Sequence, residues 1–416
     1  MFKKIFYLII LNLFFISIAC DTPENFEFKL DPCRYNPVVT DQKSLDSISH
    51  CKSISYSLEI KNTSLTNLEG LSNLESVKGH IKIIGNSNLT NLEGLRNLKS
   101  PGAGGIIISG NSSLTSLEGL SGLTSIDGLI SHPLSYNGLI ITHNNSLINL
   151  HGLENLTTLN GSIQIYGNDS LTSLSGLNNL TSIEGCLDIR DTNTLTNFDG
   201  LDNLTSIGTY IYIWNNSSLT TLIGLNHITS VGQGVFVGNN SKLTNLDGLN
   251  NLPTSIGGIH IRNNDALVNL NSLNHITSVG RLAIEYNDSL INLDAFNNIS
   301  TIKYHLEIVS NPILENLNAL NKVTSVDFNF IIENNDSLIN LSGLNNFTSV
   351  GYMSIKNNDS LSNLDDLSNL TTVEYEFAIE NNTTLPTCAV NNFFDQLIGF
   401  DGTVSISGND DSGTCD

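Results

Sequence analysis

Apolar residues recur along most of the chain in a unit of about 24 residues. Counted from a leucine, the first, fourth, seventh, tenth, thirteenth, seventeenth and nineteenth positions are apolar. The last two, such as Ile211 and Ile213, are separated by a single residue, and this period of two predicts a β-strand that buries one face. The units start at Leu65, Leu89, Leu114, Leu147, Leu171, Leu195, Leu219, Leu243, Leu267, Leu290, Leu314, Leu338, Leu361 and Leu385.

These leucines are spaced by 24, 25 and 33 residues and then by 23 or 24. Such regular spacing predicts stacked coils, because each unit must bury its apolar edge against a neighbour of the same kind. No window contains a helical stripe long enough for a covering helix. The pattern therefore predicts an all-β, parallel β-solenoid of about 14 coils.

An asparagine stands three residues before almost every one of these leucines. We expect this column to point inward, where each amide bonds to the neighbouring coil and satisfies turn groups that need a partner when buried. Only Thr192 interrupts the column, and it keeps a hydrogen-bonding side chain. We therefore expect the asparagine column to be structural. The column comprises Asn62, Asn86, Asn111, Asn144, Asn168, Asn216, Asn240, Asn264, Asn287, Asn311, Asn335, Asn358 and Asn382.

The repeated L-x-x-L-x-G-L-x-N-L stretch resembles a leucine-rich repeat. With the following G-x-I-x-I-x-x-N, as in LTTLIGLNHITSVGQGVFVGNN at 219–240, the unit is more similar to the receptor L domain of insulin- and epidermal-growth-factor-receptor ectodomains. The resemblance covers about residues 57–387. It implies a right-handed solenoid and a binding role, and it transfers neither a ligand nor any binding residue.

The first twenty residues resemble a bacterial lipoprotein signal. Lys3 and Lys4 precede an apolar run too short for a membrane span, and residues 17–20 resemble a lipobox in which Ser17 replaces the usual leucine. The resemblance implies lipidation at Cys20, export, and surface exposure at the outer membrane. An ordinary cleaved signal that ends in cysteine is the alternative. The chain then divides into the signal (1–20), tether and N-terminal cap (21–56), solenoid (57–387) and C-terminal cap (388–416).

Cysteine usage agrees with an oxidising location. Cys33 and Cys51 precede the repeats, and Cys388 and Cys415 follow them, so we expect one disulfide in each cap. Cys186, in mid-array, is left as a free thiol without a nearby histidine. The C-terminal cap is also expected to hold a short helix at 389–398 and a last strand at 404–406.

Composition narrows the ligands. A net charge of −22 argues against nucleic acid and anionic membrane surfaces, so any membrane contact is expected through the lipid alone. Low aromatic content and 33 glycines favour a turn-rich repeat over a compact enzyme core. The nine histidines lack metal-ligand spacing, and no phosphate-binding loop or nucleophile elbow is present, so we expect neither a metal nor a cofactor.

The outward strand positions in mid-array are rich in aromatic residues and arginine. Rings and guanidinium groups supply the stacking surface and donors that sugars and protein partners need. Aromatic residues also pack on one another along sheets, which is the alternative. The predicted ligand-binding residues are Tyr166, Arg190, Tyr210, Tyr212, Trp214, Phe236, His260 and Arg262, and Arg281 lies on the same face.

Two insertions occur at the same phase of the repeat, so both should project from one edge. The longer adds nine residues between Ile126 and Leu139, including His132, Pro133 and Tyr136, and the shorter adds one at 101–104. Insertions of this kind build recognition surfaces or are harmless loop growth.

Outward carboxylates offer the best enzymatic interpretation. Glu285, Glu307 and Glu333 lie on neighbouring coils about 7 Å apart, a separation that suits glycosidases, but an open, solvated acidic face would not raise a carboxyl pKa. Turn aspartates stack as the pairs Asp265–Asp288 and Asp336–Asp359, which suit either calcium or turn capping.

Three functions therefore compete: a cell-surface binding or adhesion module for a glycan or protein, a glycan-active enzyme, and a passive structural rod. The aromatic and arginine residues favour the non-catalytic binding module.

Overall fold

The computed structural model describes residues 31–128 and 137–415. The signal, Cys20 and most of the tether lie outside the described residues, as do His132, Pro133 and Tyr136 of the long insertion. Residues Pro32–Asp416 form one unit, to which the following description applies. Within the described ranges, no helix is long and apolar enough to cross a membrane.

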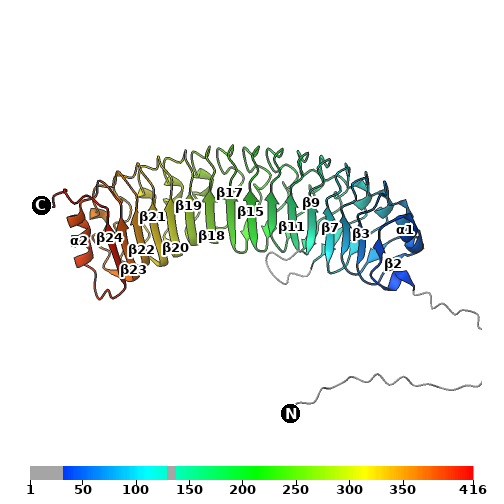
Figure 1. Cartoon of the computed structure of the whole chain (residues 1–416), viewed down its shortest axis with the longest axis horizontal. Coiled ribbons are helices and arrows are strands. Elements are labelled where there is room, and N and C mark those ends of the chain that lie inside the picture. The colour runs from blue at the N-terminus through cyan, green and yellow to red at the C-terminus, as the bar shows by residue number, and fades with distance from the viewer. Residues whose placement is uncertain (1–30, 129–136, 416) are drawn as a thin grey trace, which may run out of the picture. The chain divides into compact units, whose positions relative to one another are not determined.

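One parallel sheet of sixteen strands follows the chain order, so the predicted parallel β-solenoid is confirmed (Figure 1). Its inward residues, such as Ile211 and Ile213, are fully buried in a continuous core. The fourteen repeat units end in the strands from β5 to β24, and β1 and β3 precede them. The strands are β1 (Val38–Val39), β3 (Leu58–Lys61), β5 (Ile81–Ile84), β7 (Gly105–Ser109), β9 (Gly138–Thr142), β11 (Ser162–Tyr166), β13 (Leu187–Arg190), β15 (Tyr210–Trp214), β17 (Gly234–Gly238), β18 (Ser255–Arg262), β19 (Ser278–Glu285), β20 (Thr301–Val309), β21 (Ser325–Glu333), β22 (Ser349–Lys356), β23 (Thr372–Glu380) and β24 (Thr403–Ser407).

Shorter strands precede the main strands in the earlier coils and form two further parallel sheets. One contains β2 (Ser53–Ile54), β4 (Ser76–Val77) and β6 (Ser100–Pro101). The other contains β8 (Ser125–Asp127), β10 (Thr158–Asn160), β12 (Ser182–Ile183), β14 (Ser206–Ile207) and β16 (Ser230–Val231). The two sheets are separated at the coil with the one-residue insertion, where an isolated antiparallel bridge joins Gly104 to Gly128. From β18 to β23 the short and long strands merge into single strands of eight or nine residues.

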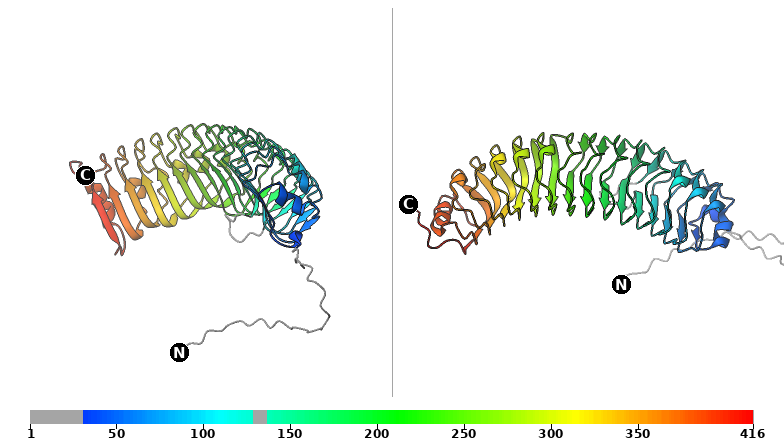
Figure 2. Two further views of the ribbon diagram at one scale, coloured as in Figure 1. Left: turned by 45° about the vertical axis from the view of Figure 1, so that its right-hand side comes forward. Right: turned by 90° about the horizontal axis from the view of Figure 1, so that it is seen from above.

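Single turns of 3₁₀-helix complete several coils, and in the described part of the array no longer helix covers the coils, as the sequence predicted. Successive coils lie side by side in both views of Figure 2. The turns are η2 (Glu69–Leu71), η3 (Glu93–Leu95), η4 (Glu118–Leu120), η5 (Asn271–Leu273), η6 (Asp294–Phe296), η7 (Asn318–Leu320) and η8 (Asp365–Leu367); η1 (Pro32–Arg34) lies in the N-terminal cap.

The asparagine column forms a buried ladder. Asn240 is typical: its Nδ2 donates to the Ile213 carbonyl at 3.2 Å, and its Oδ1 accepts the Asn216 backbone N–H at 3.0 Å. The predicted structural role is therefore confirmed, with Thr192 donating its hydroxyl to Asn216.

Two details of the predicted ladder differ. The prediction at Asn62 is wrong, because the first coil is one residue shorter in its turn: Asn62 is exposed with a φ of 51°, and Thr63 takes the buried position and bonds to Asn86. At the other end Asn409 extends the ladder, with its Oδ1 accepting the Asn382 N–H.

Both caps contain a helix and a disulfide. The bridges Cys33–Cys51 and Cys388–Cys415 form as predicted, and Cys186 is free and buried. Helix α2 (Thr387–Asp395) starts two residues earlier and ends three residues earlier than predicted. Helix α1 (Gln42–Ile48) was not predicted, although Asp41 and Ser44 form a capping box at its start, which the sequence pattern could have revealed.

Candidate ligand-binding face

The pairing of the strands aligns the predicted site residues in three outward columns. The first column runs Tyr166, Arg190, Trp214, Gly238, Arg262, Glu285, the second Asp188, Tyr212, Phe236, His260, Ala283, Glu307, and the third Cys186, Tyr210, Gly234, Gly258, Arg281, His305. All eight predicted residues therefore lie on neighbouring positions of one surface, which we call the mid-array face. Their ligand-binding role remains a prediction.

The aromatic residues of the mid-array face pack on one another and are only half exposed. Tyr212 and Phe236 stack with centroids 4.7 Å apart, and Tyr210 meets Phe236 edge to face at 5.5 Å. The Trp214 indole lies over Gly238, where any Cβ would collide with the ring. Packing along the ladder therefore accounts for part of the surface that the sequence suggested was free for a ligand.

Arg190 is committed to an ion pair that the sequence did not reveal. Asp188, two residues earlier on β13, is 1% exposed, and one of its carboxylate oxygens accepts from Arg190 Nη2. Its other oxygen has no hydrogen-bond partner among the described residues. Burial raises the pKa of Asp188 against the opposing effect of Arg190. Arg190 also lies over the Tyr166 ring, at 5.5 Å from its centroid.

A second charged network joins β18, β19 and β20. Arg281 binds Glu307 through Nε at 3.0 Å and also through Nη2, and Arg262 Nη1 lies 3.3 Å from Glu285. Burial acts to raise the pKa of Glu285, but His260, whose Nε2 lies 3.4 Å from the Glu285 carboxylate, and the two arginines outweigh it and lower the pKa.

The predicted solvated acidic face is therefore wrong for Glu285 and Glu307, which are buried and paired with cations because the registers of adjacent strands bring arginines beside them. The lowered pKa of Glu285 also opposes a general acid role, which needs a raised pKa. Glu333 accepts a hydrogen bond from Ser354.

Cys186 is a further buried titratable side chain of this face. It lies opposite Ser162, whose hydroxyl accepts the Cys186 backbone N–H at 3.1 Å. Burial raises the pKa of the Cys186 thiol. The thiol therefore stays protonated near neutral pH, which makes it a poor nucleophile.

An exposed row of aromatic side chains on later coils was missed. Each member follows a buried Ile or Val by two residues, where strict alternation would turn it inward, so the strand period alone could not have revealed it. Tyr352 and Tyr375 stack at 4.8 Å, and Tyr304 lies 6.0 Å from Phe328. The row, one residue on each of β20 to β23, is Tyr304, Phe328, Tyr352 and Tyr375, which are 39–47% exposed.

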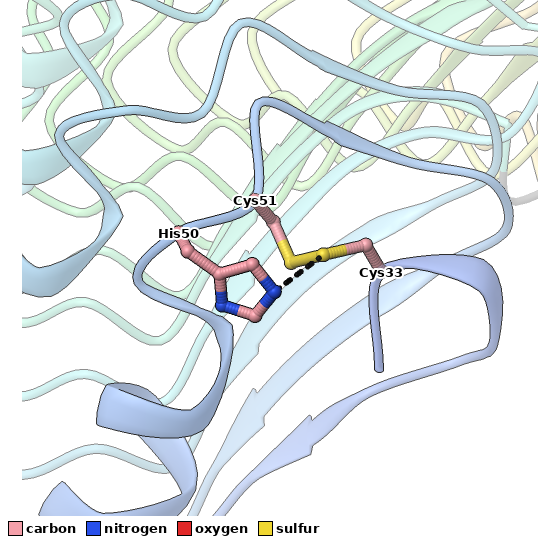
Figure 3. A group of neighbouring side chains, drawn as sticks. All are labelled: Cys33, His50 and Cys51. Carbon is pink, nitrogen blue, oxygen red and sulfur yellow. Dashed lines mark hydrogen bonds between the residues drawn. A yellow bond between two sulfur atoms is a disulfide. The ribbon is translucent and has the colours of Figure 1, made fainter. Parts of the chain in front are cut away.

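Among the described residues, one group of three His, Cys, Asp or Glu side chains lies close enough to share a metal ion. It is Cys33, His50 and Cys51, and His50 Nε2 lies 3.5 Å from Cys33 Sγ (Figure 3). The disulfide uses both sulfurs, so this group lacks the thiolates that a metal would need. The paired turn aspartates form no such group within the described ranges; Asp359 instead accepts from the Thr383 hydroxyl at 3.1 Å.

Comparisons with known proteins place this surface in context. No curated protein matches the chain. A leucine-rich repeat protein from Bacteroides ovatus ATCC 8483 is 13% identical, with a TM-score of 0.22, over 89% of this chain and 92% of its own. The functional domain of InlJ from Listeria monocytogenes is 17% identical, with a TM-score of 0.21, over 77% and 75%. The structure of a TLR13–ssRNA13 complex matches at 14% identity and a TM-score of 0.15, over 88% and 83%.

Scores this low carry no further argument. The family model of the receptor L domain matches residues 155–256, a stretch that contains most of the mid-array face. This match to the receptor L domain indicates a binding or scaffold module. The resemblance to receptor L domains is therefore confirmed over these residues.

Proposed function

We propose that the protein is a non-catalytic binding module of a cell surface and that it recognises an extracellular glycan or protein through the mid-array face. The observation that carries the proposal is the alignment of five aromatic and three basic or imidazole side chains on adjacent strands around Trp214. Aromatic and arginine side chains contribute most of the energy of many interfaces. The net charge of −22 leaves nucleic acid out of the proposal.

Two features favour binding over catalysis and over a passive rod. The carboxylates that suggested a glycosidase are tied to Arg281, Arg262 and Ser354, and the pKa of Glu285 is lowered, which opposes a general acid role. A passive rod would need only the inward core and the asparagine ladder. The concentration of large outward side chains on a few coils is typical of an interaction surface.

Trp214→Ala is expected to weaken ligand binding at least about tenfold, because truncating an aromatic hot spot costs about 2 kcal/mol or more. Stability should fall by only about 1 kcal/mol, since the indole is half buried against Gly238. Binding of the ligand found by glycan array and pull-down, measured by calorimetry with thermal melting alongside, tests this.

Tyr56→Ala is the matched control for this experiment, because Tyr56 is 58% exposed and lies in the N-terminal cap. Glu307→Ala, at another outward position, is unsuitable as a control because Glu307 is paired with Arg281. Unchanged affinity in Trp214→Ala would rule out the mid-array face.

We further propose that the chain is exported and anchored to the outer membrane by lipid on Cys20. The lipobox-like residues 17–20 support this proposal. Metabolic labelling with a fatty-acid analogue should mark the wild type and leave Cys20→Ala unmarked. Labelling that persists in Cys20→Ala would contradict it.

A further inference from the structure

The third outward column of the mid-array face contains a gap. Tyr210 on β15 is followed in register by Gly234, Gly258 and then Arg281. Two consecutive strands therefore carry no side chain at this position. At the usual spacing of strands, the three steps from the tyrosine to the arginine span about 14 Å.

An open depression of about 390 Å³ occupies this gap. This volume lies at the lower end of the range for small-molecule sites, about 300–1,000 Å³. We call it the glycine slot. It is lined by Tyr210, Gly232, Gln233, Phe236, Gly257, Gly258 and Arg281.

Backbone packing requires glycine at two positions around the slot, but it does not require glycine at Gly258. A Cβ at Gly234 would lie 2.7 Å from the Gly258 carbonyl oxygen, and one at Gly257 would collide with the Gln233 carbonyl. At Gly258 the nearest atoms, both of Arg281, would lie 3.8 Å away, which is ordinary van der Waals contact, and φ is not positive. A glycine inside a strand costs stability and often marks a bulge, a bend or close approach by a ligand or another backbone; at Gly258 no backbone lies close enough to need it.

The lining offers both apolar and polar contacts. Tyr210 and Phe236 provide rings at one end, which suit the C–H faces of a sugar. The Gln233 amide, which can donate and accept, forms no hydrogen bond with the described protein. Arg281 bounds the other end, and its charge is balanced by Glu307 and Glu285.

This charge balance selects between ligands. The slot holds no unpaired cation to attract a polyanion, and the chain as a whole carries a net charge of −22. A ring with several hydroxyl groups needs the donors and acceptors that Gln233 supplies, together with an apolar wall. An uncharged pyranose meets these conditions.

We propose that the glycine slot binds one pyranose unit of a neutral polysaccharide, between Tyr210 and Arg281. This inference rests on the proposed function and names the ligand class of the same face. It also assigns a role to Gly258, which the sequence did not single out.

Native electrophoresis of the full chain, in gels that contain a single polysaccharide, tests the proposal. The neutral probes are β-glucan, mannan, xylan and starch, and the anionic probes are alginate and polygalacturonate. At least one neutral probe should retard the wild type, and neither anionic probe should. Gly258→Val fills the slot with a residue that favours strands, so it should weaken retardation at least about tenfold.

Thr403→Val is the matched control, because it adds the same side chain to an exposed position on β24 and should be retarded like the wild type. A thermal melt checks folding, and Tyr210→Ala replaces Gly258→Val if that variant fails to fold. Normal retardation of a folded Gly258→Val, retardation by anionic probes alone, or no retardation by any neutral probe would overturn the proposal.

The variants also separate this inference from the proposed function. Binding of a neutral glycan that Trp214→Ala abolishes and Gly258→Val retains would preserve the mid-array face and refute the slot. The reverse pattern would preserve the slot and refute a face centred on Trp214. If the chain captures a protein partner in a way that depends on Trp214 and binds no glycan, the proposed function stands and the proposal of a neutral glycan in the slot is refuted.

Discussion

Asn240→Ala is expected to lower the free energy of unfolding by about 4 kcal/mol, because it leaves two buried backbone groups without partners at about 1–3 kcal/mol each. Asn240 is fully buried, and its amide satisfies the Ile213 carbonyl and the Asn216 N–H. The backbone N–H of residue 240 also donates to Asn264, and this bond should persist because the substitution leaves the backbone in place. Urea unfolding followed by circular dichroism measures the change.

Asn251→Ala provides the matched control on a neighbouring stretch of chain. Asn251 is exposed, and its Nδ2 donates to the Asn226 carbonyl, which water can solvate when the side chain is removed. We expect a loss of about 0.5 kcal/mol or less. Similar losses in the free energy of unfolding for the two variants would show that burial does not increase the contribution of the ladder to stability.

Arg190→Met is expected to destabilise the fold by about 3 kcal/mol at neutral pH, because it leaves the Asp188 carboxylate buried without a counter-charge. The estimate is at the low end for buried pairs, since Arg190 itself is 44% exposed. Asp188→Asn in the same chain should recover most of the loss. The readout is again urea unfolding, with Arg96→Met as control: Arg96 is 60% exposed in its pair with Glu93, so the loss should be below about 1 kcal/mol.

The loss in Arg190→Met should also depend on pH in one direction. Burial already raises the pKa of Asp188 above the ordinary value of an aspartate, and removing the arginine raises it further. The folded state then binds a proton that the unfolded state has released, so stability falls as pH rises through the folded pKa. The difference from wild type should therefore be smaller at about pH 4.5 than at about pH 8. A difference that grows toward acid would contradict this account of Asp188.

The repeat spacing was sufficient to predict the solenoid and the register of its outward columns. Trp214 lies between Arg190 and Gly238 as counted from the sequence, because each coil adds one strand to the same sheet. The spacing failed only where a turn changed length, as at Asn62, since a deletion of one residue leaves the leucine positions almost unchanged.

Burial of the outward residues could not be predicted from the same count. Alternation assigns Asp188 and Glu307 to the outer face, but it does not say which neighbours lie over them. That depends on the reach of long side chains such as Arg281 across strands. The charge pairs are thus consistent with the sequence yet visible only in three dimensions.

The two disulfides lie only at the ends of the array. In a solenoid each coil is stabilised only by its neighbours, so local unfolding begins at a terminal coil and proceeds inward coil by coil. Cys33–Cys51 and Cys388–Cys415 cross-link the two caps, where this unfolding would begin. The bridges therefore act as end stops, and a reducing agent would first expose the outermost coils to proteases while leaving the middle of the array intact.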